Sequence, residues 1–148
     1  MMKGFHNKVL HINLDQKTSA EEAIDDSVYR ALWGGKGLGT YLLLKNTQGG
    51  VDPFSADNAI IFATGPATDT KIWGSSRLAA FTKSPLTGGY CETYTGGKVA
   101  EPASRTGYDA IIIKGASKEP VYLEITTGKV TFHDASHLWG KETYETED

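Results

Sequence analysis

Residues 59–66, Ala59-Ile60-Ile61-Phe62-Ala63-Thr64-Gly65-Pro66, decide the fold of this chain. Consecutive apolar side chains over a short stretch are typical of a strand that is buried on both faces, and the Thr-Gly-Pro sequence ends it. A second run, Asp109-Ala110-Ile111-Ile112-Ile113-Lys114-Gly115, has the same character. The sequence therefore predicts two buried strands.

Segments outside these two runs predict the remaining elements. Strands are expected at residues 8–15, 77–82 and 90–95, and a hairpin at residues 121–125 and 130–133. Helices are expected at residues 28–33, after a polar connection and the cap Asp25-Asp26-Ser27, and at about 38–46. Asp134-Ala135-Ser136 is expected to cap a final helix. Since helices come early and strands mostly late, the predicted class is α+β, with mostly antiparallel sheets and a few short helices.

Length, charge and cysteine content exclude several classes of protein. The 148 residues suffice for one domain with a sizeable core. The net charge is −3 and there is no basic run, so no nucleic-acid partner is expected. The single cysteine, Cys91, excludes an internal disulfide framework, fits a reducing compartment and cannot by itself hold an iron–sulfur cluster. No apolar run approaches the length of a membrane span, so no membrane partner and a cytoplasmic location are expected.

Small residues and one arginine are concentrated in residues 74–97. Gly74-Ser75-Ser76-Arg77 leads into one predicted strand, and Thr95-Gly96-Gly97 follows another. Main chain without side chains can approach a flat or phosphorylated ligand closely, and a guanidinium suits anionic oxygens. Arg77 is open to two interpretations, a structural ion pair or a contact with a phosphate, and the residues alone do not decide between them.

Three other candidate sites have simpler explanations. Gly35-Lys36-Gly37-Leu38-Gly39 lacks the spacing and the preceding strand of a dinucleotide-binding turn, so helix punctuation and close packing are expected there. His133 ends a predicted strand and His137 lies in the following turn, which does not bring them together as metal ligands. Cys91 has no histidine nearby in sequence and is expected to behave as a small hydrophobe.

Several segments, in order along the chain, resemble the N-terminal domain of tungsten-containing aldehyde ferredoxin oxidoreductases. They are Gly34-Gly35-Lys36-Gly37-Leu38-Gly39-Thr40-Tyr41-Leu42-Leu43-Leu44-Lys45, Phe62-Ala63-Thr64-Gly65-Pro66, Ser76-Arg77, Thr82-Lys83-Ser84-Pro85-Leu86-Thr87-Gly88, Gly107-Tyr108-Asp109-Ala110-Ile111-Ile112 and Asp134-Ala135-Ser136-His137-Leu138-Trp139-Gly140-Lys141. Because these matches cover almost the whole chain at family-like spacing, they are more specific than any single motif. The resemblance implies that residues 1–148 form a single, incomplete domain of this type.

The resemblance also implies a cofactor. In that family, tungsten or molybdenum is held by two pyranopterins whose phosphates are bridged by magnesium, beside a [4Fe-4S] cluster. By resemblance, Arg77 reaches the pterin and the neighbourhood of the cluster, while Tyr94, Gly96 and Gly97 meet the pterin and its phosphates. Better-known members carry asparagine at the position of Tyr94, so tyrosine can serve there only if the contact is a backbone carbonyl.

Members of the family oxidise aldehydes to carboxylic acids and pass the electrons to ferredoxin. The cluster cysteines and the acid–base residues are implied to lie in remaining domains or in a partner chain, so no catalytic or metal-ligating residue is assigned here. The expected function is the cofactor-binding part of such an enzyme, inactive alone. The alternative is a non-catalytic remnant or accessory module that binds a phosphorylated small molecule or a partner protein. An unpaired sheet edge favours its self-association as a homo-oligomer.

Overall fold

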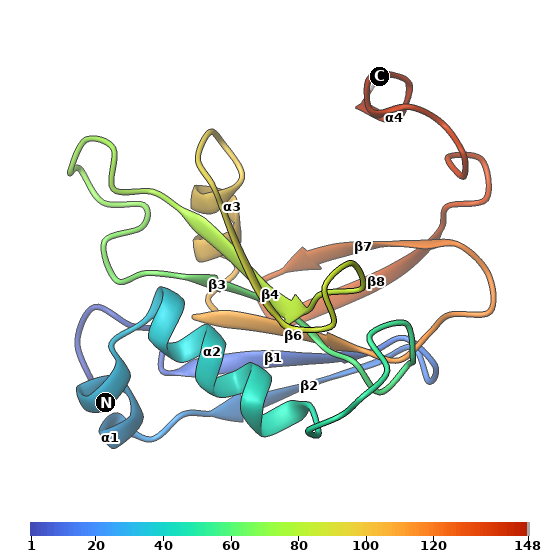
Figure 1. The fold of residues 1–148 in the computed structure, drawn as a ribbon. Coiled ribbons are helices and arrows are strands. Elements are labelled where there is room, and N and C mark those ends of the chain that lie inside the picture. Colours follow the sequence, from blue (N-terminus) through green and yellow to red (C-terminus); the bar gives the residue numbers. More distant parts are fainter. Residues whose placement is uncertain (148) are drawn as a thin grey trace.

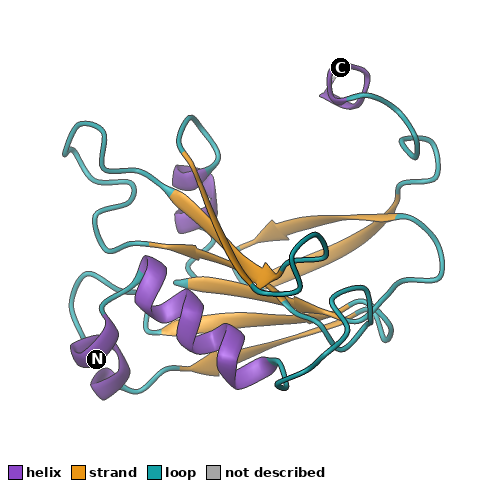
Figure 2. Ribbon diagram, viewed as in Figure 1, coloured by secondary structure: helices purple, strands orange, loops and turns teal. Residues whose placement is uncertain are grey.

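The computed structural model describes residues 1–147, in which a six-stranded sheet lies between two helices and a two-stranded hairpin (Figure 1, Figure 2). The strands are β1 (Lys8–Asn13), β2 (Thr18–Ala23), β3 (Ile60–Thr64), β4 (Leu78–Lys83), β5 (Tyr90–Thr95), β6 (Ala110–Lys114), β7 (Val121–Thr126) and β8 (Lys129–Asp134). The helices are α1 (Asp26–Leu32), α2 (Gly35–Asn46), α3 (Ala100–Arg105) and α4 (Thr143–Glu147). The α+β class predicted from the sequence is confirmed.

The large sheet is mostly antiparallel, as predicted. Its strand order is β2-β1-β6-β3-β4-β5. Only β1 and β6 run parallel, with Val9 opposite Ala110, so the first strand lies beside one from the last third of the chain. The outer edge of β5 pairs with no other strand among residues 1–147. Its backbone hydrogen-bonding groups on that side are therefore free to meet another chain segment.

The main core lies between the sheet and helices α1 and α2. Ile61 of β3, Phe81 of β4 and Ile112 of β6 point to this face and are buried against Leu38 and Leu42 of α2. Burying a side chain of this size contributes about 1.5–3 kcal/mol through the hydrophobic effect. The two runs that the sequence marked as buried strands are β3 and β6, neighbours at the centre of the sheet.

A second core lies under the hairpin of β7 and β8. Leu10 and Ile12 of β1 are buried on the face opposite α2, together with Tyr108. Leu123 of β7 and Phe132 of β8 pack against them. The strand β1 is consequently buried on both faces, and the predicted hairpin is confirmed as a separate small sheet.

The strand β2 was missed, because residues 18–23 were expected to form a polar connection. Its side chains are nearly all exposed, so no apolar alternation marks it in the sequence. Backbone pairing with β1 at the edge of the sheet defines it instead. Two ion pairs hold it in place, Lys8 with Glu21 at 3.1 Å and Lys45 with Glu22.

The helices also depart from the predictions. Helix α2 begins at Gly35, earlier than expected, and the short helix α3 was not expected at all. The final helix does not follow its expected cap. Asp134 Oδ1 accepts hydrogen bonds from the Ser136 amide and hydroxyl, but only turns follow, and α4 begins at Thr143. Gly140, between the cap and α4, has φ +83°, a left-handed conformation that does not continue a right-handed helix.

Gly39 marks the closest approach of α2 to the sheet. A Cβ at this position would lie 2.2 Å from Cε2 of Phe81, whose ring is fully buried. We expect Gly39→Ala to lower the free energy of unfolding by about 1–3 kcal/mol, the range for overpacked cores, as measured by urea denaturation. The matched control is Gly49→Ala, because nothing lies within 4 Å of a Cβ there. Equal unfolding midpoints for the two variants would contradict this packing.

Candidate functional site

Antiparallel pairing of β4 and β5 brings the predicted site residues together. Leu78, the first residue of β4, lies opposite Thr95, the last residue of β5. Arg77 and Gly96 extend the two strands at the same end of the sheet. A Cβ on Gly96 would lie 3.4 Å from Nη1 and 3.5 Å from Cζ of Arg77, so the guanidinium lies against this stretch of main chain.

The guanidinium of Arg77 is exposed, and its hydrogen bonds within residues 1–147 go to main chain of its own loop. Its Nη1 donates hydrogen bonds to the Ser76 carbonyl at 2.8 Å and the Gly74 carbonyl at 3.3 Å. Within residues 1–147, no carboxylate forms an ion pair with it. Of the two interpretations of Arg77, the structural ion pair is therefore not observed among these residues, and a contact with a phosphate stays a prediction. These two carbonyls fix one edge of the guanidinium and leave its other N–H groups available.

The bend after β5 is open main chain. Gly97 has φ +73°, in the left-handed region that favours glycine, and no atom of residues 1–147 would lie within 4 Å of a Cβ at this position. Gly96, half-buried by Arg77, has no side chain that would displace the guanidinium. A guanidinium and a bare bend therefore share one surface at the end of the sheet.

Tyr94 turns its ring away from that bend. Its ring packs edge-on against Phe81, with centroids 6.4 Å apart and an interplanar angle of 86°, and half of the residue is exposed. The next inward residue on this face of β5, Glu92, forms a 2.7 Å ion pair with Lys36 of α2. Hydrogen bonds from Lys36 and Tyr90 lower the pKa of the Glu92 carboxyl. These contacts fix the strand β5 that carries the bend.

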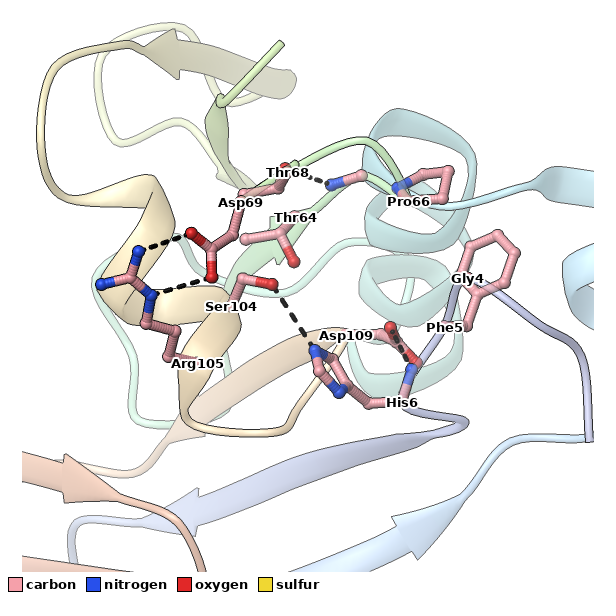
Figure 3. Close-up of a pocket in the computed structure, with 11 residues that line it drawn as sticks. Gly4, Phe5, His6, Thr64, Pro66, Thr68, Asp69, Ser104, Arg105 and Asp109 are labelled. Carbon is pink, nitrogen blue, oxygen red and sulfur yellow. Dashed lines mark hydrogen bonds and ion pairs between the residues drawn. The ribbon is translucent and has the colours of Figure 1, made fainter. Parts of the chain in front are cut away.

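A cavity formed by the described residues lies elsewhere. It has a volume of about 430 Å³ and lies between the N-terminal segment, the loop after β3 and helix α3 (Figure 3). None of the four predicted site residues lines it. Asp69 and Arg105 form a bidentate ion pair at its margin, and the guanidinium lowers the pKa of the Asp69 carboxyl. Sequence reasoning missed this pair, since no motif links its two members.

Asp109 forms the floor of this cavity and is a structural hub. Its buried carboxylate accepts hydrogen bonds from the amides of His6 and Asn7, at 3.0 and 2.7 Å, and from the Tyr29 hydroxyl at 2.6 Å. Burial and this carboxylate raise the pKa of Tyr29. The carboxylate thereby joins the N-terminal segment, α1 and the start of β6.

Among residues 1–147, no three or more His, Cys, Asp or Glu side chains are grouped so that they could hold a metal ion. No helix in this part of the chain has the length and apolar character needed to cross a membrane.

Comparison with known proteins gives the class and then the family. A solved structure, described as the active site complex BamBC of benzoyl coenzyme A reductase in complex with 1,5-dienoyl-CoA, matches 99% of this chain with a TM-score of 0.94 and 35% sequence identity. The fold is thus that of a domain found within a reductase of known structure. A family model described as "Aldehyde ferredoxin oxidoreductase, N-terminal domain" matches residues 9–148. The chain belongs to this family, as the resemblance predicted.

Curated relatives agree with this assignment. The tungsten-containing aldehyde ferredoxin oxidoreductase of Pyrococcus abyssi is 42% identical over 146 residues, and that of Pyrococcus furiosus is 38% identical. The WOR-like subunit of an aliphatic sulfonate oxidoreductase from Pyrococcus furiosus is 32% identical over 151 residues. Each match covers 98–99% of this chain but 24% of the relative. The chain therefore spans about a quarter of the length of these relatives.

Proposed function

We propose that the end of the sheet at Arg77 and Gly96 binds a bis-pyranopterin cofactor of tungsten or molybdenum, with phosphates bridged by magnesium, in a larger oxidoreductase. The observation that carries this proposal is the contact between an exposed guanidinium, which has no carboxylate partner within residues 1–147, and main chain without side chains. The tungsten-containing relatives favour this cofactor over other phosphorylated ligands.

The residues present fit a flat ligand with phosphates. Arg77 offers N–H groups that its own loop does not use, and charge-assisted hydrogen bonds to phosphate are among the stronger ones in proteins. Gly97 leaves its side of the bend open, so a planar ring system can lie directly on the backbone. Arg77 therefore binds and orients the ligand, and the bend supports it.

Tyr94 contributes main chain rather than its side chain. Its ring is held against Phe81, on the face of the sheet that α2 covers. A backbone carbonyl at this position is available whatever the side chain is, because β5 lies at the edge of the sheet. On this account, a tyrosine in place of asparagine leaves the cofactor contact intact.

Catalysis requires the rest of the enzyme. When bound, the metal centre supplies the redox chemistry that oxidises an aldehyde to a carboxylic acid, with ferredoxin as electron acceptor. The chain contains one cysteine, Cys91, half-buried in β5. Four thiolates commonly hold a [4Fe-4S] cluster, so its ligands come from other domains or a partner chain.

The test is a chimera in which this chain replaces the matching first quarter of the Pyrococcus abyssi relative. We expect the purified chimera to hold tungsten and pterin in the same ratio as its parent, by metal analysis and pterin fluorescence after oxidation. A folded chimera that holds neither would contradict the proposal and favour the accessory-module alternative. The parent enzyme and the parent without these residues are the controls.

A further inference from the structure

Helix α3 lies next to both parts of the proposed site. It begins three residues after Gly97, and its side chains Ala100 and Ser104 are buried. Its side chains Glu101 and Arg105 contact the loop of residues 65–77, which ends in Arg77 and is called the arginine loop below. One short helix thus contacts the arginine loop and follows directly after the bend at Gly96 and Gly97, called the glycine bend below.

Four side chains connect α3 to the arginine loop, two from each. Arg105 Nε and Nη2 donate to the two carboxylate oxygens of Asp69 at 2.8 and 2.6 Å (Figure 3). Arg105 Nη2 also lies 3.7 Å from Glu101 Oε2, and the Ser76 hydroxyl donates to Glu101 Oε1 at 3.4 Å. The Ser76 hydroxyl in turn accepts a hydrogen bond from the Asp69 amide at 3.2 Å. These contacts form a closed ring, and one of its members, Ser76, immediately precedes Arg77.

The backbone conformation of Asp69 suggests what the ion pair with Arg105 stabilises. Its φ is +60°, a conformation that is uncommon outside glycine and is tolerated best by Asn and Asp. Such a conformation persists where surrounding contacts determine it. The bidentate bond to Arg105 is the contact that holds this residue, and with it the course of the loop toward Ser76 and Arg77.

We propose that Asp69 and Arg105 are positioning residues that fasten the arginine loop to α3 and so hold Arg77 over the glycine bend. This inference rests on the proposed function of Arg77. The pair is partly exposed, with 63% of the Arg105 side chain and 28% of the Asp69 side chain accessible. Exposed ion pairs add little to global stability, so breaking this one frees the loop without unfolding the domain.

The first measurement is limited proteolysis of this chain with trypsin. Lys71 lies exposed in the middle of the loop and reports on its mobility. We expect Arg105→Ala and Asp69→Asn to speed cleavage after Lys71 at least about fivefold, while the melting temperature shifts by less than about 4 °C. Asparagine keeps the size and the left-handed preference of Asp69, so this variant removes the charge alone. Arg105→Lys should restore part of the protection. Arg30→Ala, which removes an exposed arginine of α1, should leave the cleavage rate unchanged.

The second measurement separates positioning from a merely structural role. The chain has three arginines, Arg30, Arg77 and Arg105, so the Nε–Hε signals of ¹⁵N-labelled protein can be assigned by single replacements. We expect Arg105→Ala and Asp69→Asn to move the Arg77 signal toward that of an unstructured arginine and to leave the Arg30 signal in place. An unmoved Arg77 signal would overturn the proposal, whatever the cleavage rate, and so would cleavage within about twofold of the parent. Neither measurement involves the cofactor, so this inference can fail while the chimera still loads tungsten.

Discussion

Replacing Arg77 with alanine in the chimera should remove most of its tungsten and pterin while the protein stays folded. The side chain is exposed, and its hydrogen bonds within residues 1–147 go to main chain of its own loop, so folding does not depend on it. A pair of charge-assisted bonds to a phosphate is worth about 3 kcal/mol, which corresponds to roughly 100-fold weaker binding. Metal analysis and pterin fluorescence at matched protein concentration measure the loss.

Two further variants make this result specific. Arg30→Ala removes another exposed arginine, on helix α1, and should leave the cofactor content unchanged. Arg77→Lys keeps the charge but not the planar fork, so it should retain an intermediate amount of cofactor. Unchanged tungsten content in Arg77→Ala would remove this residue from the site.

Replacing Asp109 with alanine should produce the largest loss of stability in this domain. The carboxylate is 5% exposed and accepts from two backbone amides and the Tyr29 hydroxyl. Removing it leaves three donors without their acceptor, and the loss at each of the two buried ones, the Asn7 amide and the Tyr29 hydroxyl, is worth about 1–3 kcal/mol if water does not replace it. We expect the free energy of unfolding to fall by about 3–5 kcal/mol, measured by urea denaturation.

The controls for Asp109 test whether the network or the single charge is responsible. Tyr29→Phe deletes one donor and keeps the ring in the core, so it should cost about 1 kcal/mol. Asp57→Ala, at an exposed carboxylate, should be neutral within about 0.5 kcal/mol. An Asp109→Ala protein as stable as Asp57→Ala would show that the network does not hold the N-terminal segment to β6.

The central strands could be predicted because their residues carry the signal locally. The apolar run of β6 reflects packing on both faces and that of β3 reflects burial in the main core, and the hairpin of β7 and β8 has its own turn. The edge strand β2 could not be predicted, since main-chain pairing rather than side-chain burial defines it. Helix α3 is six residues long and contains Pro102, so neither periodicity nor length marks it. The predicted capping hydrogen bond at Asp134 forms, but turns follow it, because capping alone does not propagate a helix.

Only part of the candidate site could be predicted from the sequence. Arg77 and the bend at Gly96 and Gly97 are conspicuous as residue types, and the pairing of β4 with β5 places them in contact. The orientation of Tyr94 toward Phe81 depends on tertiary packing. The pairing of Asp69 with Arg105 joins positions 36 residues apart that form no motif. Such long-range polar contacts leave no local pattern. Binding of the pterin itself remains a prediction.

The most direct test is a crystal structure of the tungsten-loaded chimera, with the metal located by anomalous scattering. We expect the Arg77 guanidinium within hydrogen-bond distance of pterin or phosphate atoms, and the main chain of Tyr94, Gly96 and Gly97 in contact with the same cofactor. A cofactor bound at another surface, with solvent over Arg77 and the glycine bend, would contradict the account.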